Sequence, residues 1–125
     1  MHTLEHRGTS GPLPTSEYDL VVNGKIVGKM QLRHQPSAGI GVPSHMASHI
    51  YYEVFPEERN KGYAKLMLSL GLLEARRIGL SEVIITVLED NTPSRRVIEK
   101  NGGEMTDAAM LPDGSKMYKY KVRLF

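Results

Sequence analysis

Residues 54–64 read Val-Phe-Pro-Glu-Glu-Arg-Asn-Lys-Gly-Tyr-Ala, and they join an apolar segment to a long helical pattern. This order predicts the end of a strand, a short polar turn and the first turn of a helix. Gly62 lets the backbone approach a ligand closely, and the first N–H groups of a helix have no partner within the helix. The turn is therefore predicted to bind an anion, and a phosphate group suits it best.

Strand and helix signals alternate on both sides of this turn. Asn23-Gly24 separates two β-rich runs and predicts a tight hairpin. A β-branched run at 83–88 predicts a central strand that is buried on both faces. The element order indicates a mixed α/β fold, with helices packed on a twisted sheet. Strands are expected at 19–22, 25–32, 48–55, 83–88, 104–110 and 116–124, and helices at 64–78 and 92–101.

The composition is typical of a soluble globular protein, with 40% hydrophobic and 24% charged residues in 125. Sixteen basic and fourteen acidic residues give a net charge of +2, which is too weak to indicate nucleic acid binding. The absence of cysteine excludes a thiol nucleophile and thiolate metal ligands. No apolar run is long enough to cross a membrane and no signal-peptide pattern is present, so we expect a cytoplasmic protein.

The first fifteen residues differ in character from the rest. Gly8, Gly11 and Pro14 interrupt every hydrophobic period in this segment. We therefore expect a flexible tail at 1–15 and a single domain at 16–125.

Three motifs in order resemble the core of the GCN5-related N-acetyltransferase (GNAT) family. They are His-Ile-x-Tyr-x-Val at 49–54, Arg-x-x-Gly-x-Ala at 59–64, and Asn-x-x-Ser at 91–94 followed by Val-Ile-Glu-Lys-Asn-Gly-Gly. The Leu32-Arg33 pair also suits the family. The resemblance covers about residues 18–124 and implies a twisted, mostly antiparallel sheet with helices packed on it. The family's usual strand and helices before the first hairpin are not expected here.

The resemblance also implies acetyl-CoA as cosubstrate and a set of residues that bind it. Backbone N–H groups of the turn would hold the pyrophosphate, and a strand N–H would bind the thioester carbonyl and stabilise the oxyanion. The next helix start would contact the cofactor arm. The residues that match these positions are Arg59, Asn60, Lys61, Gly62, Tyr63 and Ala64 in the turn, Val54 and Phe55 in the strand, and Asn91 and Ser94 at the helix start.

Acetyl transfer to an amine also needs a proton acceptor, because an ammonium group cannot attack a thioester. His49 is the first candidate and Glu53 the second; a regular strand places both on one face. Many family members protonate the leaving thiolate with a helix tyrosine, but Ile98 occupies that position here. Two alternatives therefore remain: another tyrosine acts as the general acid, or the thiolate leaves without receiving a proton. Tyr51, Tyr52 and Tyr63 are the nearest tyrosines in sequence.

The predicted function is N-acetyl transfer from acetyl-CoA to a primary amine of a small molecule or peptide, by direct attack in a ternary complex. The alternative is a non-catalytic acyl-CoA-binding sensor or interaction module. No metal is expected, because the His45 and His49 pair lacks the adjacent glutamate of a helical metal motif and leads into a predicted strand, where residues four apart are distant. A homodimer is expected to cover the open sheet edge. Acceptor selectivity is expected from the loop at 35–47 and the hairpin at 112–114.

Overall fold

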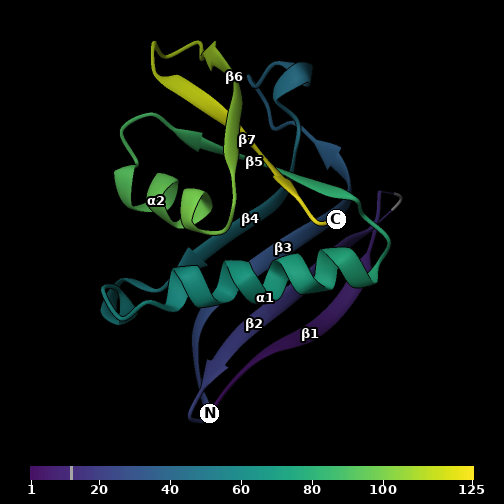
Figure 1. Ribbon diagram of the computed structural model, residues 1–125, viewed down its shortest axis with the longest axis vertical. Helices are drawn as coiled ribbons and strands as arrows, with labels where there is room; N and C mark the ends of the chain where they lie inside the picture. The colour runs from purple at the N-terminus through teal and green to yellow at the C-terminus, as the bar shows by residue number, and fades with distance from the viewer. Residues whose placement is uncertain (12) are drawn as a thin grey trace.

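Two hydrogen-bonded β-sheets and two α-helices make up residues 1–11 and 13–125, which the computed structural model describes (Figure 1). All strand pairs within each sheet are antiparallel, and the predicted mixed fold with helices on a mostly antiparallel sheet is confirmed. The elements are β1 (His2–Ser10), β2 (Thr15–Val22), β3 (Lys25–Ser37), β4 (Ser48–Val54), α1 (Tyr63–Arg77), β5 (Glu82–Leu88), α2 (Thr92–Lys100), β6 (Glu104–Met110) and β7 (Lys116–Arg123), with 3-10 turns η1 (Ser44–Met46) and η2 (Pro56–Glu58).

The first sheet has the order β1-β2-β3-β4, and its first strand differs from the expectation of a flexible tail. β1 pairs with β2 along its whole length. The glycine and proline residues that suggested a tail do not prevent this pairing. Gly8 lies at a register shift, and Gly11 and Pro14 lie in the turn that follows β1. Residue 12 lies outside the described residues. A paired β-strand at His2–Ser10 thus takes the place of the expected tail.

The second sheet has the order β5-β7-β6, which corrects the prediction of a central strand at 83–88. β5 lies at the edge of its own sheet, yet Val83, Ile85 and Val87 are buried in the core. The β-branched run correctly indicates burial, but β5 is paired on one edge only, and the strand near its other edge is β4 of the first sheet.

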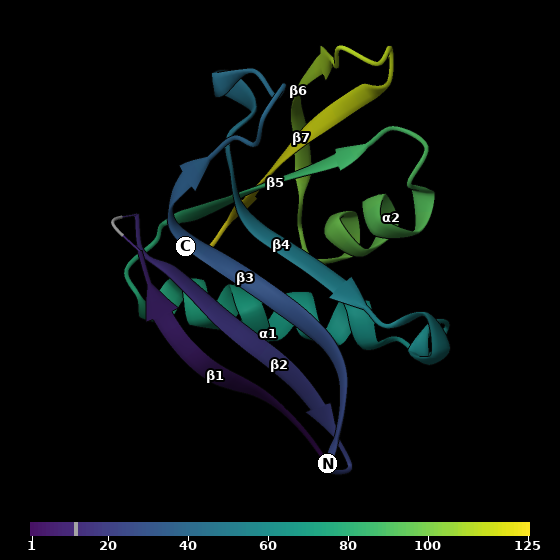
Figure 2. The same cartoon turned by 180° about the vertical axis from the view of Figure 1, so that it is seen from behind.

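β4 and β5 begin side by side and then diverge towards their C-terminal ends (Figure 2). They share no ladder of backbone hydrogen bonds, since each belongs to a different sheet. One side-chain bond joins them, in which the Ile84 N–H donates to His49 Nδ1 at 2.9 Å. The hydrogen bond therefore connects β4 and β5 near their N-terminal ends, and the two strands are separated at their C-terminal ends.

Helix α1 crosses one face of the first sheet and buries Met67, Leu68 and Ala75 against it (Figure 1). Gly71 lets the helix approach closely, because a Cβ at this position would collide with the sulfur of Met30. None of the helices among the described residues has the length and apolar character needed to cross a membrane.

Candidate functional site

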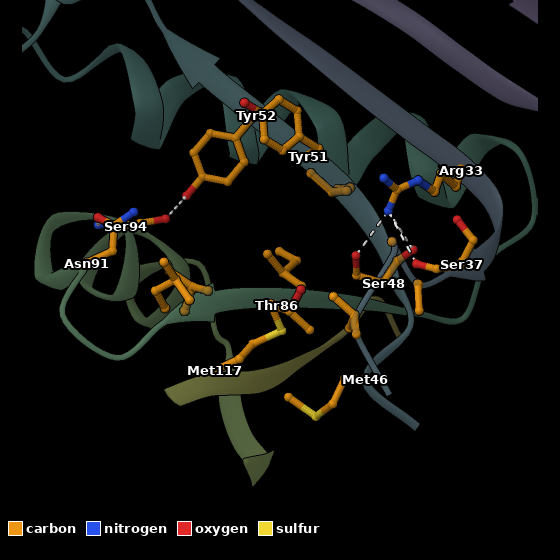
Figure 3. Close-up of a pocket in the computed structure, with 17 residues that line it drawn as sticks. Arg33, Ser37, Met46, Ser48, Tyr51, Tyr52, Thr86, Asn91, Ser94 and Met117 are labelled. Carbon is orange, nitrogen blue, oxygen red and sulfur yellow. Dashed lines mark hydrogen bonds between the residues drawn. The ribbon is translucent and has the colours of Figure 1, made fainter. Parts of the chain in front are cut away.

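A cavity of about 310 Å³ lies in the opening between β4 and β5 (Figure 3). The loop at 35–47, predicted to influence the acceptor, contributes five of the lining residues, whereas the hairpin at 112–114 contributes none of those described. The lining residues are Arg33, Ser37, Ala38, Gly39, Val42, Met46, Ser48, Ile50, Tyr51, Tyr52, Ile85, Thr86, Val87, Leu88, Asn91, Ser94 and Met117.

One end of the cavity is formed by the start of α2. Asn91 is the N-cap of this helix, and its side-chain oxygen accepts a hydrogen bond from the Ser94 N–H at 3.3 Å. The Ser94 hydroxyl lies 2.9 Å from the hydroxyl of Tyr52, which reaches across from β4 (Figure 3). The structure therefore brings Asn91 and Ser94 together at the cavity with a tyrosine.

Burial raises the pKa of the Tyr52 hydroxyl, and the hydrogen bond with Ser94 offsets this only in part. Tyr52 therefore keeps its proton at neutral pH, and the same shift makes it a weaker acid than a free tyrosine. Ile98, at the family's tyrosine position, is fully buried in the hydrophobic core and has no access to the cavity. The position is thus used for packing in this chain.

The opposite end of the cavity carries Arg33 of β3. One terminal guanidinium nitrogen donates to the Ser48 carbonyl oxygen at 3.3 Å and to the Ser48 hydroxyl at 3.2 Å. The same nitrogen lies 3.5 Å from the Ser37 carbonyl oxygen. Sequence reasoning assigned no site role to Arg33, because a single arginine on a strand gives no signal without its neighbours in space.

His49 does not line the cavity, although it lies at the vertex between the two sheets. Its side chain is 5% exposed, and its Nδ1 accepts the Ile84 N–H. Burial lowers the pKa of His49, and the positive charge of Arg33 acts in the same direction against the opposing effect of Glu82. In the neutral ring an accepting Nδ1 leaves the proton on Nε2. Neither nitrogen is then free to take a proton from an amine in this arrangement.

Glu53 also lies outside the cavity, on an exposed position of β4. It borders a second, smaller hollow together with Lys29, its partner residue on β3. Neither predicted base is therefore brought into the cavity. Among its seventeen lining residues there is no carboxylate and no imidazole.

The turn between β4 and α1 has the geometry expected of an anion site. Asn60 and Gly62 both adopt left-handed backbone conformations, with φ of 64° and 80°. The first helical bond runs from the Leu66 N–H to the Gly62 carbonyl oxygen at 3.2 Å, so the N–H groups of residues 63–65 precede the helical ladder. No acidic residue occupies the first turn of α1.

Charges around the turn are partly neutralised by a buried carboxylate. Glu58 accepts hydrogen bonds from Lys25 at 2.6 Å and from Lys61 at 2.9 Å. These two ammonium groups lower the pKa of Glu58. Lys61 therefore helps to order the turn and contributes less charge to an anion than the sequence suggests, whereas Arg59 is exposed.

Of the two predicted strand donors, only one is available. The Phe55 N–H already donates to the Val27 carbonyl oxygen of β3 at 3.0 Å. Because N–H groups along an antiparallel strand point alternately to its two sides, the N–H of Val54 faces away from β3, towards the opening. The backbone therefore offers Val54 and not Phe55 to a ligand.

Residues 5–103 match the model of the Acetyltransferase (GNAT) family. No curated protein sequence matches the chain. Structures of similar fold include yncA of Salmonella typhimurium with its cofactor acetyl-CoA, Mycobacterium smegmatis RimJ in complex with CoA-disulfide, and AAC(6')-Ib in complex with ribostamycin and coenzyme A. Their TM-scores are 0.71, 0.71 and 0.69, at identities of 18%, 22% and 17%. The matches cover 89%, 87% and 87% of this chain but 65%, 53% and 64% of those proteins, so the chain spans less than two thirds of each.

Proposed function

Because this chain belongs to the GNAT family of acetyltransferases, we propose that it transfers an acetyl group from acetyl-CoA to a primary amine by direct attack in a ternary complex. The observation that carries the proposal is the course of β4, which borders the cavity and then leads directly into the anion-binding turn. A pyrophosphate at the turn and a thioester in the cavity would thus be bound by one continuous segment. The acetyl-CoA and coenzyme A bound to the relatives support this cosubstrate.

The turn fits a pyrophosphate in three respects. Nothing lies within 4 Å of the position that a Cβ of Gly62 would take, so the backbone is open on that side. The N–H groups of residues 63–65 make no helical hydrogen bond, because the first such bond is donated by Leu66. The first turn of α1 contains no carboxylate that would compete with an anion for them. We assign pyrophosphate binding to residues 59–64, and contact with the cofactor arm to Asn91 and Ser94.

In the proposed reaction the amine nitrogen attacks the thioester carbonyl carbon, the new C–N bond forms and the C–S bond breaks. The Val54 N–H stabilises the oxyanion that develops on the carbonyl oxygen. The proton lost by the amine passes to water, or through water to Glu53, which we retain as the candidate base. The departing thiolate takes a proton from Tyr52, which lines the cavity and regains a proton from solvent.

Replacing Tyr52 with phenylalanine should lower kcat about 10- to 100-fold and leave the Kd for acetyl-CoA nearly unchanged, because only proton donation is removed. Steady-state thiol release and calorimetry measure the two quantities. Ser94→Ala is the matched control, since it removes the partner of the Tyr52 hydroxyl and keeps the proton donor. An unchanged kcat in Tyr52→Phe would mean that the thiolate leaves unassisted.

A non-catalytic acyl-CoA-binding module is the second candidate. The specific observation in its favour is that no carboxylate or imidazole lines the described cavity. Both candidates predict that acetyl-CoA raises the melting temperature, since a ligand that binds only the folded state stabilises it. Only the enzyme releases thiol with at least one amine of a broad panel. Binding without release from any amine would favour the module, and no thermal shift would contradict both.

We also propose a homodimer. β1 forms an edge of the first sheet, and nearly all of its residues are exposed. Unpaired strand edges are usually covered, and a second copy of the chain is a simple way to cover this one. Sedimentation equilibrium distinguishes the dimer from a monomer.

A further inference from the structure

We propose that the amine acceptor carries a carboxylate group and that Arg33 binds it. This inference rests on the proposed acetyl transfer and names the class of substrate that the same cavity takes. Arg33 is the only side chain with a full charge at neutral pH among the seventeen that line the described cavity. Its charge therefore sets the sign of the group that this end of the cavity favours.

The guanidinium group is held in place while much of it stays available. The hydrogen bonds of its side chain to Ser48 and Ser37 all come from a single terminal nitrogen. Within residues 1–11 and 13–125, neither the Nε nor the second terminal nitrogen has a hydrogen-bond partner, and no carboxylate lies within 4.0 Å of Arg33. These two nitrogens form the edge that binds a carboxylate with two parallel hydrogen bonds.

The position of Arg33 orients such an acceptor. Arg33 and Ser94 lie on opposite sides of the cavity, and the hydroxyl of Tyr52 lies on the Ser94 side (Figure 3). A carboxylate at Arg33 would direct the amino group of the same molecule towards Tyr52 and the opening beside β4. A diamine would instead bring a second positive charge to Arg33, where no lining carboxylate offsets it.

The volume of the cavity suits a small acceptor. About 310 Å³ must hold the acetylated end of the cosubstrate as well as the acceptor. Ligand cavities of this volume are at the lower end of those that bind small molecules. The geometry thus favours an amino acid or a similarly small amino carboxylate.

The test compares amino carboxylates with their own carboxamides, so that each pair differs only in the charged group. Glycine, β-alanine, γ-aminobutyrate and L-alanine, each with its amide, are assayed by thiol release with rates corrected for the fraction of free amine. Wild-type kcat/KM should be at least about 100-fold higher for one or more acids than for the matched amide. Equal rates with acids and amides, or a preference for diamines, would overturn the assignment.

Two variants then examine Arg33 itself. Arg33→Gln should lower kcat/KM for the acid about 100-fold and change that for the amide less than about threefold, with an unchanged acetyl-CoA Kd. Arg33→Lys keeps the charge but loses the planar fork, so its kcat/KM for the acid should lie between wild type and Arg33→Gln. An equal loss for acid and amide in Arg33→Gln would contradict carboxylate binding.

Binding of the same acids to the coenzyme A complex, followed by NMR line broadening, separates this inference from the proposed function. Binding that needs Arg33 but leads to no transfer would support the carboxylate site and contradict the enzyme. Transfer without any preference for acids would support the enzyme and contradict the carboxylate site. Absence of both binding and transfer would contradict both.

Discussion

Replacing Gly62 with aspartate should weaken acetyl-CoA binding by at least about 100-fold. The new carboxylate would lie beside the N–H groups that precede the α1 ladder, where it competes with the pyrophosphate and repels it. Two like charges about 4 Å apart near a protein surface repel each other by about 4 kcal/mol. A loss of affinity of about 100-fold corresponds to less than this repulsion. Calorimetric titration with acetyl-CoA, and the thermal shift that the ligand causes, measure the effect.

Gly62→Asn is the matched control for this experiment. Asparagine has the same shape as aspartate and tolerates the left-handed conformation that Gly62 adopts with φ of 80°. The open space around Gly62 should allow both variants to fold. We expect asparagine to weaken binding less than about 10-fold, because it brings no charge. Equal affinities of wild type and Gly62→Asp would show that the turn does not bind the pyrophosphate.

Local signals predict most of the fold. Asn23 and Gly24 both adopt positive φ in the hairpin that their dipeptide predicts, and Gly114 does so in the last hairpin. The error at residues 2–10 has a physical cause. β1 is an exposed edge strand, and its stability comes from pairing with β2 rather than from burial of an alternating apolar face. A hydrophobic period is absent from such a strand, so the sequence resembles a loop.

In the candidate site, too, some parts can be predicted from neighbouring residues in the sequence and others cannot. The turn before α1 and the Asn91 cap of α2 are each formed by a few consecutive residues. Their geometry therefore follows from local conformation. The cavity depends on distant contacts, such as the approach of Tyr52 to Ser94 and of Arg33 to Ser48. His49 illustrates the difference best. Its residue type suggests a base, while its burial and its bond to Ile84 are visible only when β4 and β5 are placed side by side.

Replacing His49 with alanine should destabilise the fold by about 2–4 kcal/mol, or roughly 10 °C in melting temperature. The change leaves the buried Ile84 N–H without an acceptor, and it leaves a cavity at the vertex of the two sheets. His49→Asn is the matched control, since its side-chain oxygen can take the place of Nδ1. We expect asparagine to recover about half of the lost stability in urea unfolding. Equal losses in the two variants would contradict a role for the hydrogen bond.

The acid dependence of stability provides a second measurement on His49. Burial lowers the pKa of the folded histidine below its ordinary value of 6.5. Between that lowered pKa and 6.5 the unfolded chain therefore binds more protons than the folded one, and the free energy of unfolding falls as the pH falls. The contribution is complete above about pH 6.5 and is lost progressively below it. The difference between wild type and His49→Asn isolates this residue from the four other histidines. Parallel curves would contradict a buried neutral imidazole.

The same asparagine variant decides between a structural and a catalytic role. Asparagine can accept the Ile84 N–H but cannot take a proton from an amine, so the two roles predict different rates. If His49 mainly fastens β4 to β5, kcat of His49→Asn should stay within about threefold of wild type at temperatures where it is folded. If His49 is the base, kcat should fall about 100-fold although the protein remains folded and binds acetyl-CoA. We expect the first result, because both ring nitrogens are already committed in the neutral form and neither predicted base lines the cavity.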